Sequence, residues 1–300
     1  GSLAVTGSAD FSYAVAGGGT VGGAWSTRAN MITAREALTG VGTVTAALGF
    51  GGQTPGVLNV TEEYNGAANT WSPGGNLITG RAYAAGAGTQ AAGLGFGGAT
   101  PATTNATEEY SSGAWSPGGP LGTQRQQLAG AGTQVAALAF GGYTALNVTE
   151  EYNSGTWSAA PANMINGRRA LGGVGTQTDF TEEYSSGAWT TGGPLPVGNY
   201  TIRGAGTQTA GLAFGGLAPG RTPATSEYNS SIWSAAPANM IIATFNVGTA
   251  GTQTSALSFG GQALGNTNST QEWGASPTPS SFVNGFNFSN STGITTVKAL

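Results

Sequence analysis

The stretch LAFGGYTALNVTEEYNSGTW, residues 138–157, contains the pattern that decides the fold. It joins an apolar segment ending in a glycine pair to a variable segment, the phrase TEEY, a short turn and a tryptophan. Small and large apolar residues that alternate before a glycine pair are typical of a strand packed on both faces. The NSG between Tyr152 and Trp157 predicts a hairpin turn. The stretch therefore predicts three consecutive short strands.

The pattern belongs to a repeat. A phrase G-T-Q or a variant of it begins at six glycines: Gly42, Gly88, Gly132, Gly175, Gly206 and Gly251. Each unit reads as four short β segments with a period of roughly 40 to 46 residues, which is typical of propeller blades, and no helical period occurs. We therefore expect an all-β fold, a β-propeller of four-stranded blades. Six blades are expected, or seven if SYAVAGG (12–18) and the tail (282–300) build another.

Two units depart from the repeat. Unit four runs from GTQT (175–178) directly into DFTEEY, so its blade is expected to be three-stranded or irregular. Unit six has Trp273 where the others have tyrosine, and no tryptophan follows it. Because VGGAWS (21–26) matches an outer strand, Trp25 is expected to lie on the outer strand of blade six and to close the ring. The expected organisation is a Gly-rich segment (1–20), a propeller (21–280) and a tail that packs on it or completes it (281–300).

The order of these phrases resembles the kelch repeat, as in RANMITAREAL, LGFGG, TEEY and TW (28–71). The wording AGTQTAGLAFGG with TEEYSSGAW is similar to Gly-rich kelch-like proteins of phages of aquatic bacteria. SADFSYAVAGGG, near the N-terminus, resembles a segment of some phage tail proteins. The resemblance implies a virion component of the particle surface, with other virion proteins or a host-surface glycan or protein as partners.

Composition narrows the chemistry. Charged residues make up 7% of the chain, there are 54 glycines, and histidine and cysteine are absent. Thiolate nucleophiles, imidazole bases and the usual zinc ligands are thereby excluded, so we expect no metal and no cofactor. A net charge of −4 with a single lysine disfavours nucleic acid as a partner. We expect no membrane insertion, because no run of some twenty apolar residues occurs, and the sequence shows no signal peptide.

The adjacent glutamates of TEEY raise the question of a general acid and its base. Successive strand residues point to opposite faces, so the two carboxylates cannot act on one substrate, and an active site needs no copy in every repeat. We expect a structural role in which one glutamate meets the arginine of its unit or backbone donors and the other meets solvent. The expected framework consists of Arg35, Arg81, Arg125 and Arg168, Glu63, Glu109, Glu151 and Glu183, and Trp71, Trp115, Trp157, Trp189 and Trp233.

The segments between the glycine pair and TEEY differ in every unit, so they are free to serve function. They carry the candidate binding residues Thr54, Tyr143, Arg221 and Gln262. We expect a non-catalytic phage virion protein of a tail fibre, tail tip or capsid surface that contacts its partner through these loops. A secreted or cell-surface adhesin and a glycan-active propeller enzyme are the alternatives, and whether the chain forms a homo-oligomer is left open.

Overall fold

The structure, a computed structural model, describes residues 23–169 and 179–275, of which Gly23–Gly274 form one unit. The expected segments 1–20 and 281–300, and the strand expected at 12–18, lie outside the described residues. The described part is all-β and contains no helix, so it contains no helix that could span a membrane.

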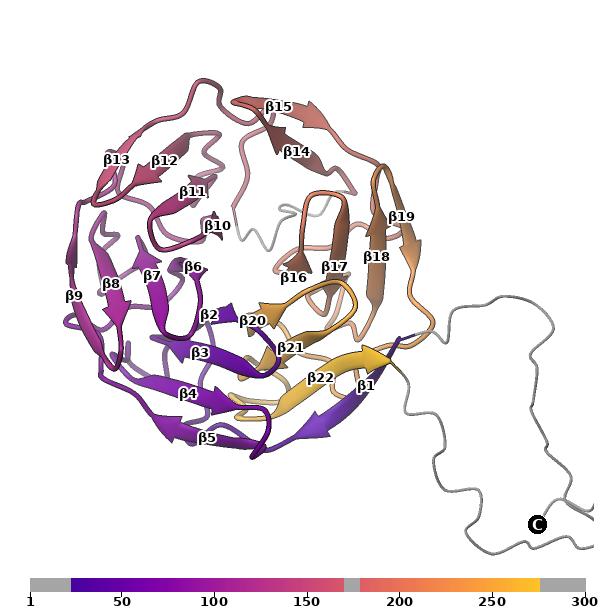
Figure 1. Cartoon of the computed structure of the whole chain (residues 1–300). Helices are drawn as coiled ribbons and strands as arrows, with labels where there is room; N and C mark the ends of the chain where they lie inside the picture. The colour runs from indigo at the N-terminus through magenta and orange to yellow at the C-terminus, as the bar shows by residue number, and fades with distance from the viewer. Residues whose placement is uncertain (1–22, 170–178, 276–300) are drawn as a thin grey trace, which may run out of the picture. The chain divides into compact units, whose positions relative to one another are not determined.

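Five four-stranded antiparallel sheets form the blades of a β-propeller arrangement (Figure 1). Blade 1 consists of β2 (Thr39–Gly42), β3 (Ala46–Phe50), β4 (Thr61–Asn65) and β5 (Thr70–Pro73). Blade 2 consists of β6 (Ala85–Gly88), β7 (Ala92–Phe96), β8 (Thr107–Ser111) and β9 (Ala114–Gly118). Blade 3 consists of β10 (Ala129–Gly132), β11 (Ala136–Phe140), β12 (Thr149–Asn153) and β13 (Thr156–Ala159).

Blade 5 consists of β16 (Arg203–Gly206), β17 (Ala210–Phe214), β18 (Thr225–Asn229) and β19 (Ile232–Ala235). Blade 6 consists of β20 (Gly248–Gly251), β21 (Ala256–Phe259), β22 (Thr270–Ala275) and β1 (Gly23–Arg28). The N-terminal strand β1 pairs with β22, the place expected from VGGAWS.

Repeat four departs further from the pattern than expected. Its described residues form only a two-stranded sheet, β14 (Glu182–Ser185) and β15 (Ala188–Thr191). The prediction of six four-stranded blades is therefore wrong, and five are described. The reason lies in the sequence: repeat four has two residues between GTQT and TEEY, whereas the other repeats have 13 or 15.

The first strands of the blades lie around a common centre (Figure 1). β2 contacts both β20 and β6, β6 contacts β10, and β16 contacts β20. Glycine permits this approach: a Cβ on Gly40 of β2 would lie 2.5 Å from the backbone nitrogen of Thr249 in β20. Glycine at Gly40 thus lets two neighbouring first strands meet backbone to backbone.

Tryptophans on the outer strands hold consecutive sheets together. The Trp115 ring packs on Phe50 of the preceding blade with ring centroids 4.8 Å apart, and its Nε1 donates to Thr61 Oγ1 at 2.9 Å. Trp71, Trp157, Trp189 and Trp25 make the same two contacts with Phe259 and Thr270, Phe96 and Thr107, Phe140 and Thr149, and Phe214 and Thr225, respectively. The regular tryptophans are thus packing residues between blades, and Trp233 is the exception.

Candidate functional site

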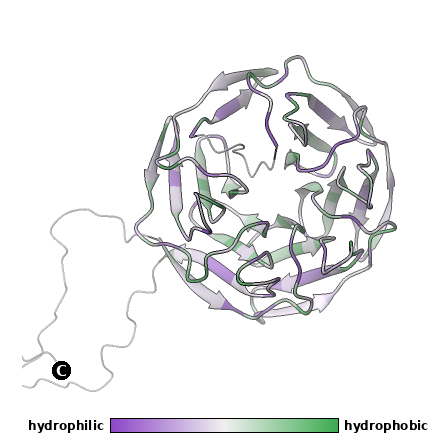
Figure 2. Cartoon of the chain, turned by 180° about the vertical axis from the view of Figure 1, so that it is seen from behind, coloured by the Kyte–Doolittle hydropathy of each residue, from purple (hydrophilic) through white to green (hydrophobic). Residues whose placement is uncertain are grey.

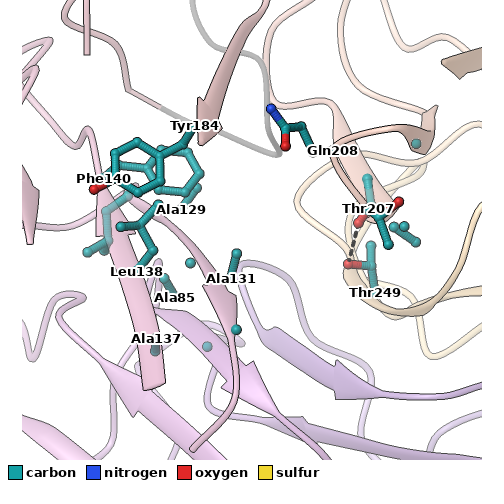
Figure 3. Close-up of a pocket in the computed structure, with 18 of the residues that line it drawn as sticks. Ala85, Ala129, Ala131, Ala137, Leu138, Phe140, Tyr184, Thr207, Gln208 and Thr249 are labelled. Atoms are coloured by element: carbon teal, nitrogen blue, oxygen red, sulfur yellow. Dashed lines mark hydrogen bonds between the residues drawn. The ribbon is translucent and has the colours of Figure 1, made fainter. Parts of the chain in front are cut away.

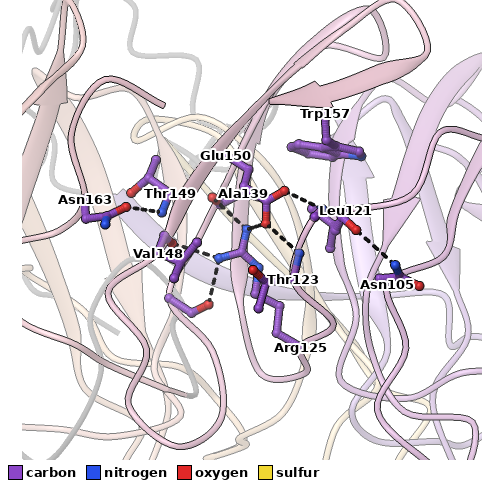
Figure 4. A network of polar contacts seen from close by, with 12 residues as sticks. Asn105, Leu121, Thr123, Arg125, Ala139, Val148, Thr149, Glu150, Trp157 and Asn163 are labelled. Atoms are coloured by element: carbon purple, nitrogen blue, oxygen red, sulfur yellow. Dashed lines mark hydrogen bonds and ion pairs between the residues drawn. The ribbon is translucent and has the colours of Figure 1, made fainter. Parts of the chain in front are cut away.

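The first glutamate of each TEEY is bound to an arginine inside its blade. In blade 3 the Arg125 guanidinium donates to Glu150 Oε1 at 2.9 Å and to the Val148 carbonyl at 2.8 Å (Figure 4). Glu150 also accepts from the backbone N–H of Gly122 at 2.6 Å and of Thr123 at 3.3 Å. Arg125 is 1% and Glu150 4% exposed, and burial lowers the pKa of Arg125. The ion pair and the backbone bonds to Glu150 connect the loop that precedes the first strand of blade 3 to the third strand of that blade.

Three further pairs have the same arrangement: Arg35 with Glu62, Arg81 with Glu108, and Arg168 with Glu182. The arginine partner is therefore the first glutamate of the motif, and the glutamates named in the expected framework are the second ones. The two repeats without the arginine also lack this glutamate. Ser226 accompanies Asn199, and Gln271 accompanies Thr244.

The second glutamate links neighbouring sheets. The Tyr184 hydroxyl donates to Glu151 Oε1 at 2.6 Å, and Tyr110, Tyr152 and Tyr228 donate to Glu63, Glu109 and Glu183 in the same way. Together with burial, this bond raises the pKa of Tyr184 and of Tyr228 to about 12. Since one glutamate faces its own loop and the other faces the next sheet, the two do not converge on a substrate. Among the described residues, no group of three His, Cys, Asp or Glu side chains could hold a metal ion.

The four candidate binding residues lie on one side of the unit, which we call the loop face. It consists of the loops between second and third strands, the segment before β14, and the loops that lead into the first strands. Tyr143 is 45% exposed, and the Arg169 guanidinium lies 5.4 Å from the centre of its ring. Arg221 donates to the Ala263 carbonyl in the loop of the next blade. Thr54 and Gln262 are half-buried, and no contact joins the four residues into one pocket.

The loop face carries most of the exposed apolar side chains. Twelve large apolar residues of the described part are exposed, and only Val135 and Ile232 lie on the opposite side, the turn face. The other ten lie in loops of the loop face: Ile32, Val57, Ile78, Tyr143, Ile165, Phe180, Val197, Ile241, Ile242 and Leu264. Figure 2 shows this face, with hydrophobic and hydrophilic segments side by side in the loops. These ten side chains make the loop face the candidate interaction surface of the described part.

Four isoleucines recur at one position of the repeat. Ile32, Ile78, Ile165 and Ile241 each follow the methionine or leucine that anchors the entering loop, and they are 56%, 57%, 53% and 54% exposed. In three of the four, the backbone N–H donates to the buried first glutamate, which fixes the backbone while the side chain faces solvent. The sequence did not single out these residues, because an apolar residue beside a core methionine looks like another core residue.

A second group that sequence reasoning missed lies where the loop face meets the centre. Glu36 accepts from Gln53 Nε2 at 3.2 Å and from Asn246 Nδ2 at 3.1 Å, and Gln53 Nε2 also donates to the Tyr83 hydroxyl at 3.1 Å. Burial and the nearby Glu36 raise the pKa of Tyr83. Tyr83 and Asn246 have positive φ angles of 58° and 54°. That conformation is uncommon for residues other than glycine and is repeated at the same position in other blades.

The positive φ values accompany a chain of backbone bonds from blade to blade. Ala37 N–H donates to the Asn246 carbonyl, Tyr83 N–H to the Ala37 carbonyl and Gln127 N–H to the Tyr83 carbonyl, each at 2.9 Å. The residue type at this position differs between repeats, whereas the backbone conformation is the same. The position therefore presents a different side chain from each blade on a constant backbone. The sequence signal was a variable residue two positions after each framework arginine.

Comparison with known protein families finds no match, and comparison with curated proteins finds none.

Proposed function

We propose that the protein is a non-catalytic binding or structural protein whose loop face is its contact surface. The observation that carries this proposal is the distribution of exposed apolar side chains, ten on the loop face against two on the turn face. A partner that covers these side chains would gain about 25 cal/mol for each Å² of apolar surface removed from water. The paired carboxylates, which would be the first candidates for catalysis, are engaged with arginines and tyrosines of the framework.

We further propose that the repeat is of the kelch type, that β1 closes the ring, and that the protein is a phage virion component. A tail fibre, a tail tip or a capsid surface is the proposed location, and virion proteins or a host-surface glycan or protein are the proposed partners. The support is the resemblance of the repeated phrases and of the N-terminal segment, together with the pairing of β1 with β22.

The test compares the two faces. A loop-face variant carries Ile32→Ser, Ile78→Ser, Ile165→Ser and Ile241→Ser, which keep every backbone donor. A turn-face control carries Val135→Ser and Ile232→Ser, at positions 57% and 68% exposed. Labelled protein is sedimented with purified phage particles and, separately, with host cells. We expect wild type and control to co-sediment with one of the two and the loop-face variant to be lost from the pellet.

Equal co-sedimentation of all three proteins would refute the loop face as the contact surface. Mass spectrometry of purified particles tests the location independently. Peptides of this chain are expected in the particles, and their absence, together with binding to cells, would favour the adhesin.

A further inference from the structure

Four loops of the loop face contain the same tight turn. Each loop joins the second strand of a blade to the third, and an antiparallel bridge between its first and last residues closes it. The bridges join Gln53 to Val57, Ala99 to Thr103, Leu217 to Arg221, and Gln262 to Asn266. Inside each turn, the second residue donates its backbone N–H to the carbonyl of the fourth at 2.8 or 2.9 Å. The backbone of each loop is therefore held in place before any partner binds.

The turn of blade 6 has a leucine at its tip, where the other three turns have proline. The tip residues are Pro55, Pro101 and Pro219 in blades 1, 2 and 5, and Leu264 in blade 6. Leu264 is 96% exposed, the highest value among the large apolar side chains of the described part. Its backbone N–H makes no hydrogen bond with the described residues, so a proline would serve this turn equally well. The turn itself thus gives no reason for a leucine.

Side chains connect three of the four turns to one another. Arg221 donates to the Ala263 carbonyl, which connects the turn of blade 5 to that of blade 6. Asn266 Nδ2 donates to the Gln53 carbonyl at 3.2 Å, which connects the turn of blade 6 to that of blade 1. We call this continuous surface the tip ridge, and it consists of residues 217–221, 262–266 and 53–57.

The tip ridge is apolar at its middle and carries one charge. Leu264 lies between the exposed prolines Pro219 and Pro55, and Val57 is 39% exposed. Arg221 is the one charged residue of the three turns. It is exposed, and its guanidinium makes a single hydrogen bond among the described residues, so most of its five donors remain available. The tip ridge therefore combines a protruding leucine with an accessible positive charge.

The centre of the unit offers a different kind of surface. Most side chains that the first strands place there are small, such as Ala85 and Ala131 (Figure 3). The tip ridge, in contrast, carries large side chains, and the residues that flank its three turns in the sequence are all described. Gly23 and Ala275 are the ends of β1 and β22 away from the loop face. The tip ridge thus has the side chains that a partner can recognise.

We propose that the tip ridge docks a folded protein, which receives Leu264 in a concave apolar pocket and places a carboxylate on Arg221. This inference rests on the proposed function of the loop face and names the class of its partner. A protruding leucine gains most from a pocket of apolar side chains, which a protein has and a glycan chain lacks. The guanidinium matches a carboxylate in charge and geometry. The closed turns favour binding, because little backbone freedom is lost when the partner docks.

The test measures co-sedimentation with the particles or cells that the wild type binds. Leu264→Pro gives the turn of blade 6 the sequence Ala-Pro-Gly of residues 218–220, so the turn is kept. We expect it to bind at least about tenfold more weakly than wild type. Arg221→Gln should bind about three- to fivefold more weakly, and Arg221→Lys should lose less because it keeps the charge. The matched control Pro101→Ser, in the turn outside the tip ridge, should bind as wild type does.

Two treatments of the particles or cells separate a protein partner from a glycan. Protease treatment should abolish binding, whereas periodate oxidation of the glycans should leave it intact. Binding that survives protease and is lost after periodate would overturn this inference and leave the loop face as a contact surface. Unchanged binding of both Leu264→Pro and Leu264→Ser would also overturn it, and the four-isoleucine variant would then show independently whether the proposed function stands.

The chain alone provides a further readout. Because the sequence has no cysteine, Leu264→Cys introduces a single thiol, which should react with DTNB as fast as a thiol in an unfolded peptide. Slow reaction would mean that the chain itself covers the tip, and would overturn the inference. A wild-type dimer in sedimentation velocity that Leu264→Pro does not form would assign the tip ridge to a second copy and overturn it too. Absence of wild-type binding to both particles and cells would overturn this inference together with the proposed function.

Discussion

The buried ion pair of blade 3 gives a prediction that the chain's own repeats make testable. Blade 6 has Thr244 and Gln271 where blade 3 has Arg125 and Glu150. In blade 6, Gln271 Oε1 accepts from Ile242 N–H at 2.9 Å, and Gln271 Nε2 donates to the Ile242 carbonyl at 3.0 Å. The perturbation is to convert the pair of blade 3 into that of blade 6, first one residue at a time and then both together.

The magnitudes follow from burial. Arg125→Thr leaves the Glu150 carboxylate 4% exposed with two backbone donors and no cation. Glu150→Gln leaves a buried guanidinium with only carbonyl partners. Removing one partner of a buried pair costs about 3–5 kcal/mol because it leaves an uncompensated buried charge, whereas the Thr–Gln pair leaves no buried charge and loses only the volume of the arginine side chain. The double variant should therefore be more stable than either single variant by about 2–3 kcal/mol.

Urea unfolding followed by tryptophan fluorescence and far-UV circular dichroism measures the free energies of unfolding of the four proteins. The matched control is Ile165→Ser, a surface substitution in another repeat that should change stability by less than about 0.5 kcal/mol. Free energies that add, so that the double variant is the least stable of the four, would refute the assignment of Arg125 and Glu150 as a mutually dependent buried pair.

Two further predictions concern aromatic residues. Trp115→Phe should destabilise the protein by about 1–3 kcal/mol, because it removes the donor to the Thr61 hydroxyl and part of the ring contact with Phe50. Trp233→Phe should cost less, because the Trp233 Nε1 has no hydrogen bond to lose. Equal losses of stability in urea unfolding would contradict this prediction. For Tyr184 and Tyr228, the folded pKa of about 12 exceeds the ordinary value of 10, so their stabilising contribution is complete below pH 10 and is lost as pH rises toward 12. Stability measured from pH 9 to 12 should fall less steeply in Tyr184→Phe and Tyr228→Phe, and an unchanged slope would count against these hydrogen bonds.

The repeat itself accounts for how much of the fold the sequence predicted. Strand position, turn position and the place of β1 follow from phrases such as FGG, NSG and GAW, because each is a local rule repeated several times. The blade count was wrong because repeat four was still counted as a blade, three-stranded or irregular, whereas its described residues form only β14 and β15.

The site was predicted less well, for identifiable reasons. Strand alternation showed that the side chains of the two glutamates point to opposite faces, but it did not show which one pairs with the arginine. The sequence contained that information, because the last two repeats lack both the arginine and the first glutamate. The asparagines Asn59, Asn105 and Asn147 were not among the predicted framework residues, yet each asparagine Nδ2 donates to the carbonyl of the anchoring leucine or methionine of the next loop. The group of Glu36 and Tyr83 joins three repeats and has no local signature.

The arrangement of the repeats about one centre depends most on β1, because this strand from the start of the described unit completes the sheet formed at its end. Amide hydrogen exchange of residues 23–28, measured by mass spectrometry on the native protein, tests this directly. The account predicts protection comparable with that of β9 (Ala114–Gly118), the outer strand of an intact blade. Exchange of residues 23–28 at the rate of an unstructured peptide would contradict it.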